Sequence, residues 1–358
     1  MSEIKAQRIA TFDVAKALVM FYVVMGHLVA NGIVTDAHAQ LNPYFENIKI
    51  GVSMPIFFMM SGYFSASSLR NGTWGKVLAR TIGFLQPVLV FGIIFGAITA
   101  LTGTLPWWKV VLYPLARVLF ANWFLLTLSI IYFAAAVIFR IARTTSARLA
   151  FCLVFYLLLL LAPKCFPLYW IGNVGHMFPY FLFGLFALKP YDLHKNLLWV
   201  APCAVIFLSI VAFEGRCWEN GMSFYAESIS LRDVTSSSQN LICFFGRMIV
   251  GITGGIFILW LLNGLCRKVP WLSKISILGT TTIGVYVMHQ WPMIQIQNFG
   301  LMSTPLPAIW QYPVALLVFM ACHYLTLLIR SSRKPRIAVF GEETSLADNI
   351  DKILERYI

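Results

Sequence analysis

The first long apolar stretch of the chain, from Arg8 to Gly32, constrains the fold more than any other feature. About 20 apolar residues cross the hydrocarbon core of a bilayer, and this stretch is long enough although it contains Asp13, Lys16 and His27. A charge near the bilayer centre costs roughly 2.5–3.5 kcal/mol on insertion scales, so such groups normally face a protein interior or a watery cavity. We interpret the stretch as a spanning helix with a functional polar face.

The three polar residues share one face of that helix. At about 100° per residue, Lys16 and His27 both lie within about 60° of Asp13 around the axis. Asp13 and Lys16 are neighbours at i,i+3, and His27 lies about 16 Å further along at 1.5 Å per residue. The alternative is an ion pair that snorkels to the inner interface, together with a packed histidine. We favour a site that handles a proton or an acyl group.

The composition is typical of a multi-pass helical membrane protein. Of the 358 residues, 59% are hydrophobic and only 11% are charged, whereas soluble domains are nearer 25% charged. The apolar runs are continuous rather than alternating, which disfavours a β-barrel. The cysteines form no C-x-x-C pair, so neither a metal site nor a redox motif is expected. A disulfide between Cys165 and Cys217 is an open alternative.

The segment Ala37-His38-Ala39 imitates a signal-peptide cleavage site. A signal peptide has an uncharged apolar region of 7–15 residues. The apolar region here is longer and contains Asp13 and Lys16. We therefore predict that it is retained as the first helix.

We predict an all-α fold, a polytopic membrane helix bundle of about ten transmembrane helices with both termini cytoplasmic. The run 106–120 is expected to lie at the interface rather than to span. A membrane domain at 1–330 is followed by a tail at 331–358, in which 345–357 has the spacing of an amphipathic helix. The predicted spans are 9–33, 51–68, 81–101, 122–139, 149–162, 174–188, 197–213, 241–262, 275–296 and 308–329.

The Lys and Arg residues determine the predicted orientation. Cytoplasmic loops of membrane proteins carry an excess of these residues, and here every second turn is basic. The basic turns are 5–8, 70–80, 140–148, 189–195, 267–274 and 330–336. Most of the formal net charge of +13 therefore comes from basic residues in the predicted cytoplasmic turns, where they set the orientation of the chain. For this reason we do not expect nucleic-acid binding. The largest outer loop, about 214–240, is long enough to cover an external cavity.

Several polar side chains are expected at one depth near the outer ends of their spans. His27, Arg247 and His289 lie five or six residues from these ends, and Tyr286 precedes His289 by about one turn. Three further residues, Asn122, Trp123 and His176, begin helices at the same boundary. Each has a structural alternative: Arg247 could snorkel to the headgroups, His289 could donate to a carbonyl of a neighbouring helix, and Asn122 and Trp123 could be interface anchors. Together they favour a polar outer cavity, whereas His323 is interpreted as a packed core histidine.

Five segments in order resemble the integral-membrane acyltransferase 3 family, closest to its sugar O-acetyltransferases of the fucose 4-O-acetylase type. They are FDVAKALVMFYVVMGH (12–27), PIFFMMSGYF (55–64), ANWFLLTL (121–128), GRMIVGITGG (246–255) and LGTTTIGVYVMHQWP (278–292). The resemblance implies that His27, which ends the first helix, is essential for acyl transfer. Many members carry an arginine eleven residues earlier, where this chain has Lys16. Lysine keeps the charge but lacks the bidentate fork.

The resemblance also implies roles for other residues and for two substrates. The catalytic candidates are His27, Arg247, His289 and Tyr286, and the donor- or substrate-binding candidates are Asp13, Lys16, Ser61, Tyr63, Asn122, Trp123 and His176. The donor implied is cytoplasmic acyl-CoA, most simply acetyl-CoA. Candidates for its phosphates are Arg70, Lys76, Arg80, Arg267, Lys268 and Lys274. No metal is expected.

Two hypotheses follow for the function. The first is an O-acetyltransferase of the bacterial inner (plasma) membrane, with 1–330 as its acyltransferase domain, which acylates an extracytoplasmic glycan or glycolipid. Transfer from a thioester to a hydroxyl needs a base, and the pKa of histidine suits that role. Whether His27 is acylated or acts as the base stays open. The second is a proton-coupled transporter, although neither broken helices nor internal symmetry is evident in the sequence.

Overall fold

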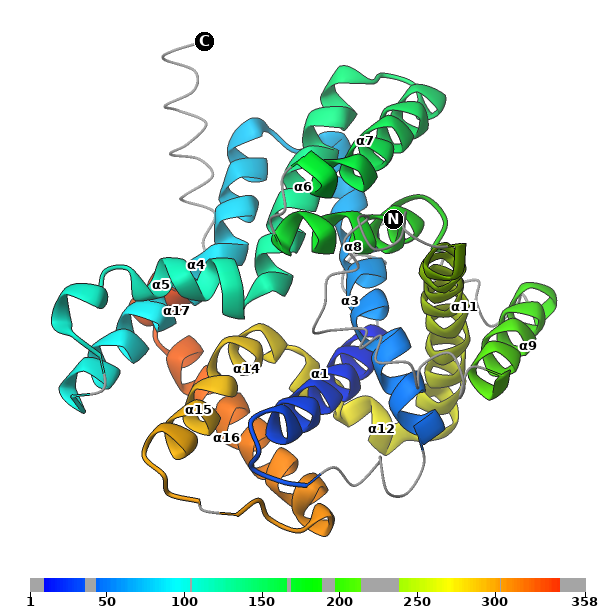
Figure 1. Ribbon diagram of the computed structural model, residues 1–358. Helices are drawn as coiled ribbons and strands as arrows, with labels where there is room; N and C mark the ends of the chain where they lie inside the picture. Colours follow the sequence, from blue (N-terminus) through cyan, green and yellow to red (C-terminus); the bar gives the residue numbers. More distant parts are fainter. Residues whose placement is uncertain are drawn as a thin grey trace, which may run out of the picture. The chain divides into compact units, whose positions relative to one another are not determined.

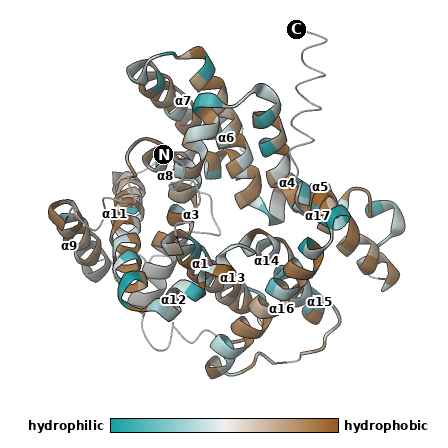
Figure 2. Cartoon of the chain, turned by 180° about the vertical axis from the view of Figure 1, so that it is seen from behind, coloured by the Kyte–Doolittle hydropathy of each residue, from teal (hydrophilic) through white to brown (hydrophobic). Residues whose placement is uncertain are grey.

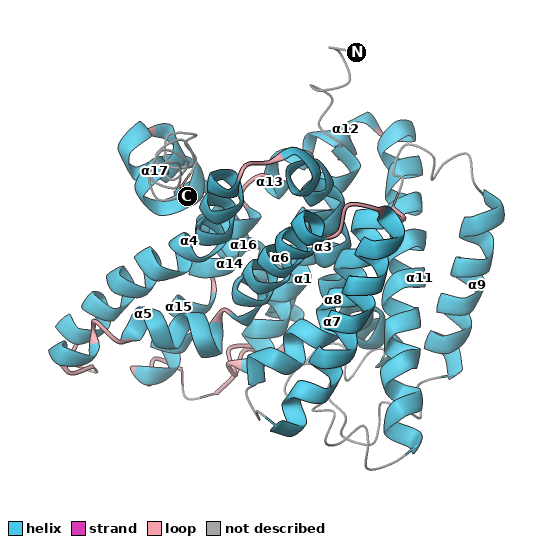
Figure 3. Ribbon diagram, turned by 90° about the horizontal axis from the view of Figure 1, so that it is seen from above, coloured by secondary structure: helices cyan, strands magenta, loops and turns pink. Residues whose placement is uncertain are grey.

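The computed structural model describes residues 10–35, 43–103, 105–165, 169–188, 197–213, 238–302 and 304–341. Within these ranges all regular secondary structure is helical (Figure 3), apart from one isolated β-bridge between Val34 and Leu306. The all-α prediction is therefore confirmed for the described chain. The predicted amphipathic helix at 345–357, most of the outer loop at 214–240, and the side chains of Cys165 and Cys217 lie outside the description.

Five helical segments of the described chain are long and apolar enough to cross a membrane. They are Ala10–Ala30, Trp74–Leu101, Trp123–Ile141, Phe245–Lys268 and Ala308–Ser331. The protein is thus a multi-pass membrane protein, while the number of about ten spans and the cytoplasmic termini stay predictions. Exposed apolar side chains fit this assignment: Leu316 and Leu317 of α16 (Gln311–Ser331) are 52% and 69% exposed, and Figure 2 shows apolar residues along that helix.

Most predicted spans correspond to helices whose ends differ from the prediction by up to eight residues. The first is α1 (Ala10–Ala30). The others are α3 (Pro43–Asn71), α4 (Trp74–Leu101), α6 (Trp123–Ile141), α7 (Thr145–Cys165), α8 (Tyr169–Phe186), α9 (Leu197–Phe213) and α11 (Ser238–Lys268). The run expected at the interface forms short turns, namely η2 (Trp107–Lys109), α5 (Tyr113–Ala116) and η3 (Arg117–Ala121).

The segment predicted as one span at 275–296 is instead interrupted twice. It consists of α13 (Ser276–Gly279), α14 (Thr282–Met288) and α15 (Gln290–Asn298), and α12 (Pro270–Lys274) precedes it. Pro292 explains the break at His289, because proline lacks the N–H that would bond the Met288 carbonyl and its ring crowds that carbonyl. The prediction of a single continuous helix was wrong on this point.

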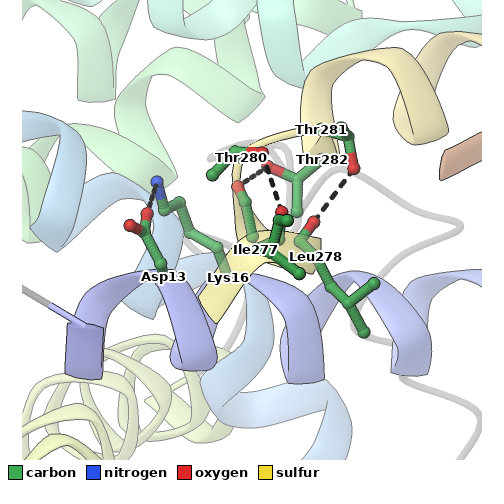
Figure 4. Close-up of polar contacts among 8 residues, drawn as sticks. Asp13, Lys16, Ile277, Leu278, Thr280, Thr281 and Thr282 are labelled. Carbon is green, nitrogen blue, oxygen red and sulfur yellow. Dashed lines mark hydrogen bonds and ion pairs between the residues drawn. The ribbon is translucent and has the colours of Figure 1, made fainter. Parts of the chain in front are cut away.

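Threonine hydroxyls stabilise the first of these two breaks. The hydroxyls of Thr280, Thr281 and Thr282 donate to the carbonyls three residues earlier, those of Ile277, Leu278 and Gly279 (Figure 4). Side chains of this type satisfy backbone acceptors where a helix is interrupted. The three consecutive threonines therefore supply hydrogen-bond donors to these carbonyls, of which that of Gly279 is buried, where α13 ends and α14 begins.

The described residues divide into two compact units. The first is drawn from Met1–Met60, Leu188–Phe224 and Phe245–Leu327, and the second from Ser61–Ala187, Tyr225–Phe244 and Leu328–Ile358. In the second unit α4 packs against α6, α6 against α8, and α8 against α7. The C-terminal α17 (Arg333–Phe340) packs on α4, where the Gln86 amide donates to the carbonyls of Ile337 and Ala338 at 2.8 Å.

In the first unit α1 packs on the interrupted segment. It contacts α12, α13, α14 and α15, and Figure 1 shows these elements beside α1. The closest approach is at Gly279, where an added Cβ would overlap the backbone of Asp13. On another side of α1, the rings of Phe21 and Phe319 of α16 meet edge to face, with centroids 6.4 Å apart. This packing sets how α1 lies against α14 and α15.

Candidate functional site

His27 occupies the last turn of α1, and the end of that helix is well defined. The helix stops because Gly32 adopts a left-handed conformation, with φ of 59°, which glycine tolerates without a steric cost. The Ile33 amide then donates to the Leu28 carbonyl at 2.9 Å, a Schellman-type closure. The Asn31 side-chain amide donates to the His27 carbonyl at 2.7 Å. The backbone that carries His27 is thereby fixed.

A second histidine lies directly against His27. The ring centroids of His27 and His289 are 5.0 Å apart, at an interplanar angle of 48°. His289 is only 1% exposed, whereas His27 is partly exposed. The two residues are far apart in the chain, so their contact depends on the packing of α1 against the break between α14 and α15. The result is one imidazole pair, the centre of the candidate active site.

The hydrogen bond of His289 determines which of its ring nitrogens carries the proton. Its Nδ1 lies 2.9 Å from the Val285 carbonyl oxygen. A carbonyl only accepts, so Nδ1 donates and the neutral ring has its lone pair on Nε2. The Tyr286 ring lies beside the same imidazole, with centroids 6.2 Å apart. The predicted neighbours His27, His289 and Tyr286 therefore do lie together.

Gln290 and Asn31 contact His27, and neither was predicted from the sequence. The Gln290 side-chain nitrogen lies 2.9 Å from Nδ1 and 3.3 Å from Nε2 of the His27 ring. The one signal available was that Gln290 directly follows His289. An uncharged amide at the end of an apolar segment does not stand out, and its orientation depends on the helix break.

Arg247 lies in α11 of the same unit and is 2% exposed. Its burial agrees with a position inside the protein rather than one that snorkels to the headgroups. His323, interpreted as a core histidine, is 3% exposed and its Nδ1 lies 2.7 Å from the hydroxyl of Thr281. That interpretation is confirmed.

At the other end of α1, Lys16 and Asp13 form an ion pair. The Lys16 Nζ lies 2.5 Å from an Asp13 carboxylate oxygen, with the side chains 25% and 10% exposed (Figure 4). At 1.5 Å per residue, Lys16 and His27 are separated by about 16 Å along the helix. The pair is next to α13, where Gly279 allows the close approach to Asp13.

The predicted binding residues on α3, η3, α6 and α8 belong to the second unit, so their place relative to the histidine pair stays a prediction. The hydroxyl of Ser65 donates to the Ser61 carbonyl at 2.6 Å, and the Asn122 amide donates to the Arg117 carbonyl at 3.3 Å. The other three pair with aromatic neighbours. Tyr63 lies against Phe64, Trp123 against Phe124 and His176 against Tyr180.

The six candidate phosphate-binding residues differ in their surroundings. Arg80 donates to the Ser68 hydroxyl at 3.1 Å and lies 5.1 Å from the centroid of the Tyr132 ring, so its guanidinium already supports the packing of the second unit. The remaining five are exposed. They are Arg70, Lys76, Arg267, Lys268 and Lys274.

The family of the chain follows from comparison with known proteins. A family model described as an acyltransferase domain, that of the acyltransferase 3 family, matches residues 9–328. The chain belongs to the acyltransferase 3 family. The match includes α1, which carries His27, and the interrupted segment, which carries His289.

One curated relative extends this comparison. Nodulation protein NolL of Mesorhizobium japonicum is 27% identical over 256 residues, which make up 66% of this chain. The match covers 64% of the relative's own length. No solved structure matches the chain.

Proposed function

We propose that the protein transfers an acyl group, most simply acetyl from acetyl-CoA, to a hydroxyl of an extracytoplasmic glycan or glycolipid. The single observation that carries this proposal is the contact between His27 and His289 within a chain of the acyltransferase 3 family. Histidine is the side chain whose ordinary pKa best suits proton transfer near neutral pH. We place the enzyme in the bacterial inner (plasma) membrane with both termini cytoplasmic.

The proposed reaction assigns roles to His27 and to the candidate residues Arg247 and Tyr286. The acceptor hydroxyl oxygen attacks the thioester carbonyl carbon, His27 takes the hydroxyl proton, and the C–S bond then breaks. The proton finally passes to the departing CoA thiolate. Positive or hydrogen-bonding groups stabilise the oxyanion that develops in such a step, and we assign this role to Arg247 and Tyr286. Acylation of His27 before transfer is the alternative sequence of events.

The donor is proposed to enter from the cytoplasmic side, where the exposed basic residues meet the phosphates of CoA. Arginine and lysine both bind phosphate groups, lysine as a point charge. The acyl arm would then pass Lys16 before it reaches His27 on the same helix. Lys16 forms an ion pair with Asp13, so a test of its role must separate donor binding from that pair.

We expect Lys16→Ala to weaken acetyl-CoA binding about tenfold or more, the usual scale for one charge-assisted hydrogen bond. Lys16→Arg should bind nearly as well as the wild type. The double variant Asp13→Asn/Lys16→Met is the control, because it removes both charges and leaves no unpaired carboxylate. Isothermal titration of the detergent-solubilised protein measures all three. If both Lys16→Ala and the double variant bound acetyl-CoA like the wild type, the donor route past Lys16 would be wrong.

A transporter is the second candidate, and one observation favours it. Interrupted helices often form the binding sites of transporters, and the segment that contacts His27 is interrupted at Thr280–Thr281 and at His289. Purified protein with labelled acetyl-CoA and extracted glycolipid separates the two functions. Protein-dependent thioester cleavage, with the label recovered in the glycolipid, supports the acyltransferase function. Counterflow of a saccharide in proteoliposomes without thioester cleavage would refute it.

A further inference from the structure

Gln290 and Gln297 form a pair of contacts between α15 and the end of α1. They are seven residues apart, about two helical turns, and therefore lie on one face of α15. The Gln290 amide nitrogen reaches the ring of His27, and the Gln297 amide donates to the Asn31 carbonyl. His27 and Asn31 are themselves one turn apart on α1. One face of α15 thus holds one face of α1 at two points.

The two glutamines differ in what they contact. Gln297 bonds a backbone carbonyl, so it holds the helix end and has no influence on a titratable group. Gln290 is within 2.9–3.3 Å of the nitrogens of an imidazole. A side-chain NH₂ only donates, so the imidazole nitrogen that it meets must accept and must be without a proton. The other nitrogen of the neutral ring then carries the hydrogen.

We propose that Gln290 is a positioning residue that keeps the proton-accepting lone pair of His27 in place until the acceptor hydroxyl arrives. This inference rests on the proposed acyl transfer and specifies how His27 is prepared for it. In the absence of the acceptor, the Gln290 amide N–H donates a weak hydrogen bond to the lone pair of the His27 nitrogen. The hydroxyl of the acceptor replaces the amide as the donor to the same nitrogen.

The step is balanced in atoms and electrons. As the hydroxyl oxygen forms its bond to the thioester carbon, its proton moves to the His27 nitrogen that Gln290 has vacated, and His27 becomes an imidazolium. Collapse of the tetrahedral intermediate breaks the C–S bond, and the imidazolium returns the proton to the CoA thiolate. Gln290 then donates to the ring again. His289 keeps its proton on Nδ1 throughout, because the Val285 carbonyl holds it there.

Two substitutions of similar size separate this role from simple packing. Gln290→Met fills the same space without a hydrogen bond, and we expect kcat to fall about fivefold to tenfold. Gln290→Glu replaces the donor with an acceptor, which favours a proton on the facing nitrogen. We expect kcat to fall at least about 100-fold, as when a general base is already protonated, with KM for acetyl-CoA within about twofold. If only packing mattered, Gln290→Glu would retain at least as much activity as Gln290→Met, and this result would overturn the proposal.

Gln297→Met is the matched control, because it removes an amide from the same face of α15 without touching the ring. We expect its kcat to stay within about twofold of the wild type. An equal loss in Gln297→Met and Gln290→Met would show that the glutamines only hold the helices together, contrary to the proposal.

A measurement without any substrate keeps this inference distinct from the proposed function. The chain has 6 histidines, and ¹⁵N-histidine labelling in proteoliposomes, with His27→Ala for assignment, isolates the His27 signals. We expect the unprotonated nitrogen of His27 to shift to higher frequency in Gln290→Met, because it loses an accepted hydrogen bond. An unchanged His27 spectrum would refute the role of Gln290 even if acyl transfer were established. The expected shift in a protein that transfers no acyl group would refute the proposed function alone.

Discussion

Replacing His27 with alanine is expected to reduce acetyl transfer by about 10²- to 10⁴-fold, the range that a positioned acid–base group contributes. His27 is the partly exposed member of the imidazole pair, whereas His289 is buried and its Nδ1 is already bonded to the Val285 carbonyl. His27 is thus the more accessible member of the pair. The assay is the transfer of label from acetyl-CoA to the acceptor glycolipid by purified protein.

The substitution should leave the fold intact, because α1 is capped through the backbone of His27 rather than through its ring. The apparent melting temperature in detergent checks this. In His27→Gly, added imidazole can occupy the vacated space, and we expect it to restore part of the activity. Transfer within about tenfold of the wild type in His27→Ala would remove the base from the proposed mechanism. If His27→Ala lost both activity and the folded state, the rescue of His27→Gly by imidazole would show whether the missing imidazole caused the loss of activity.

The second large effect is expected at Gly279, where α13 meets α1. In Gly279→Ala the new Cβ would overlap the carbonyl of Asp13, and this contact is with backbone rather than with a flexible side chain. The two helices must therefore separate. Overpacking of this kind costs about 1–3 kcal/mol, and more where nothing can relax. We expect a clearly lower apparent melting temperature in detergent.

Gly264→Ala in α11 is the control for this prediction. An added Cβ at Gly264 would meet no atom within 4 Å, and alanine favours a helix over glycine by up to about 1 kcal/mol. Its melting temperature should equal or exceed that of the wild type. Equal melting temperatures for Gly279→Ala and Gly264→Ala would contradict the close packing of α1 on α13. Because that packing also sets how His27 lies against His289, Gly279→Ala should lose acyl transfer as well.

Local sequence patterns were sufficient for the elements and for the features within one helix. The continuous apolar runs predict helices, and the i,i+3 spacing makes Asp13 and Lys16 neighbours; the structure contains the ion pair that was the alternative interpretation of these two residues. Hydrophobic periodicity is a property of neighbouring residues, so it carries this information directly. The same pattern predicted one helix at 275–296, because it does not register that Pro292 and the threonines at 280–282 interrupt the backbone hydrogen bonds.

The sequence alone determined that the chain is rich in membrane-spanning helices, resembles the acyltransferase 3 family and has a histidine at the end of its first helix. Only the tertiary structure decided that Gln290, 263 residues further along, is a partner of that histidine. It also decided that His289 lies against the same ring. The physical reason is that contacts between distant residues depend on how helices approach and where they break. Here Gly279 allows the close approach of α13 to α1, and Pro292 explains the break at His289.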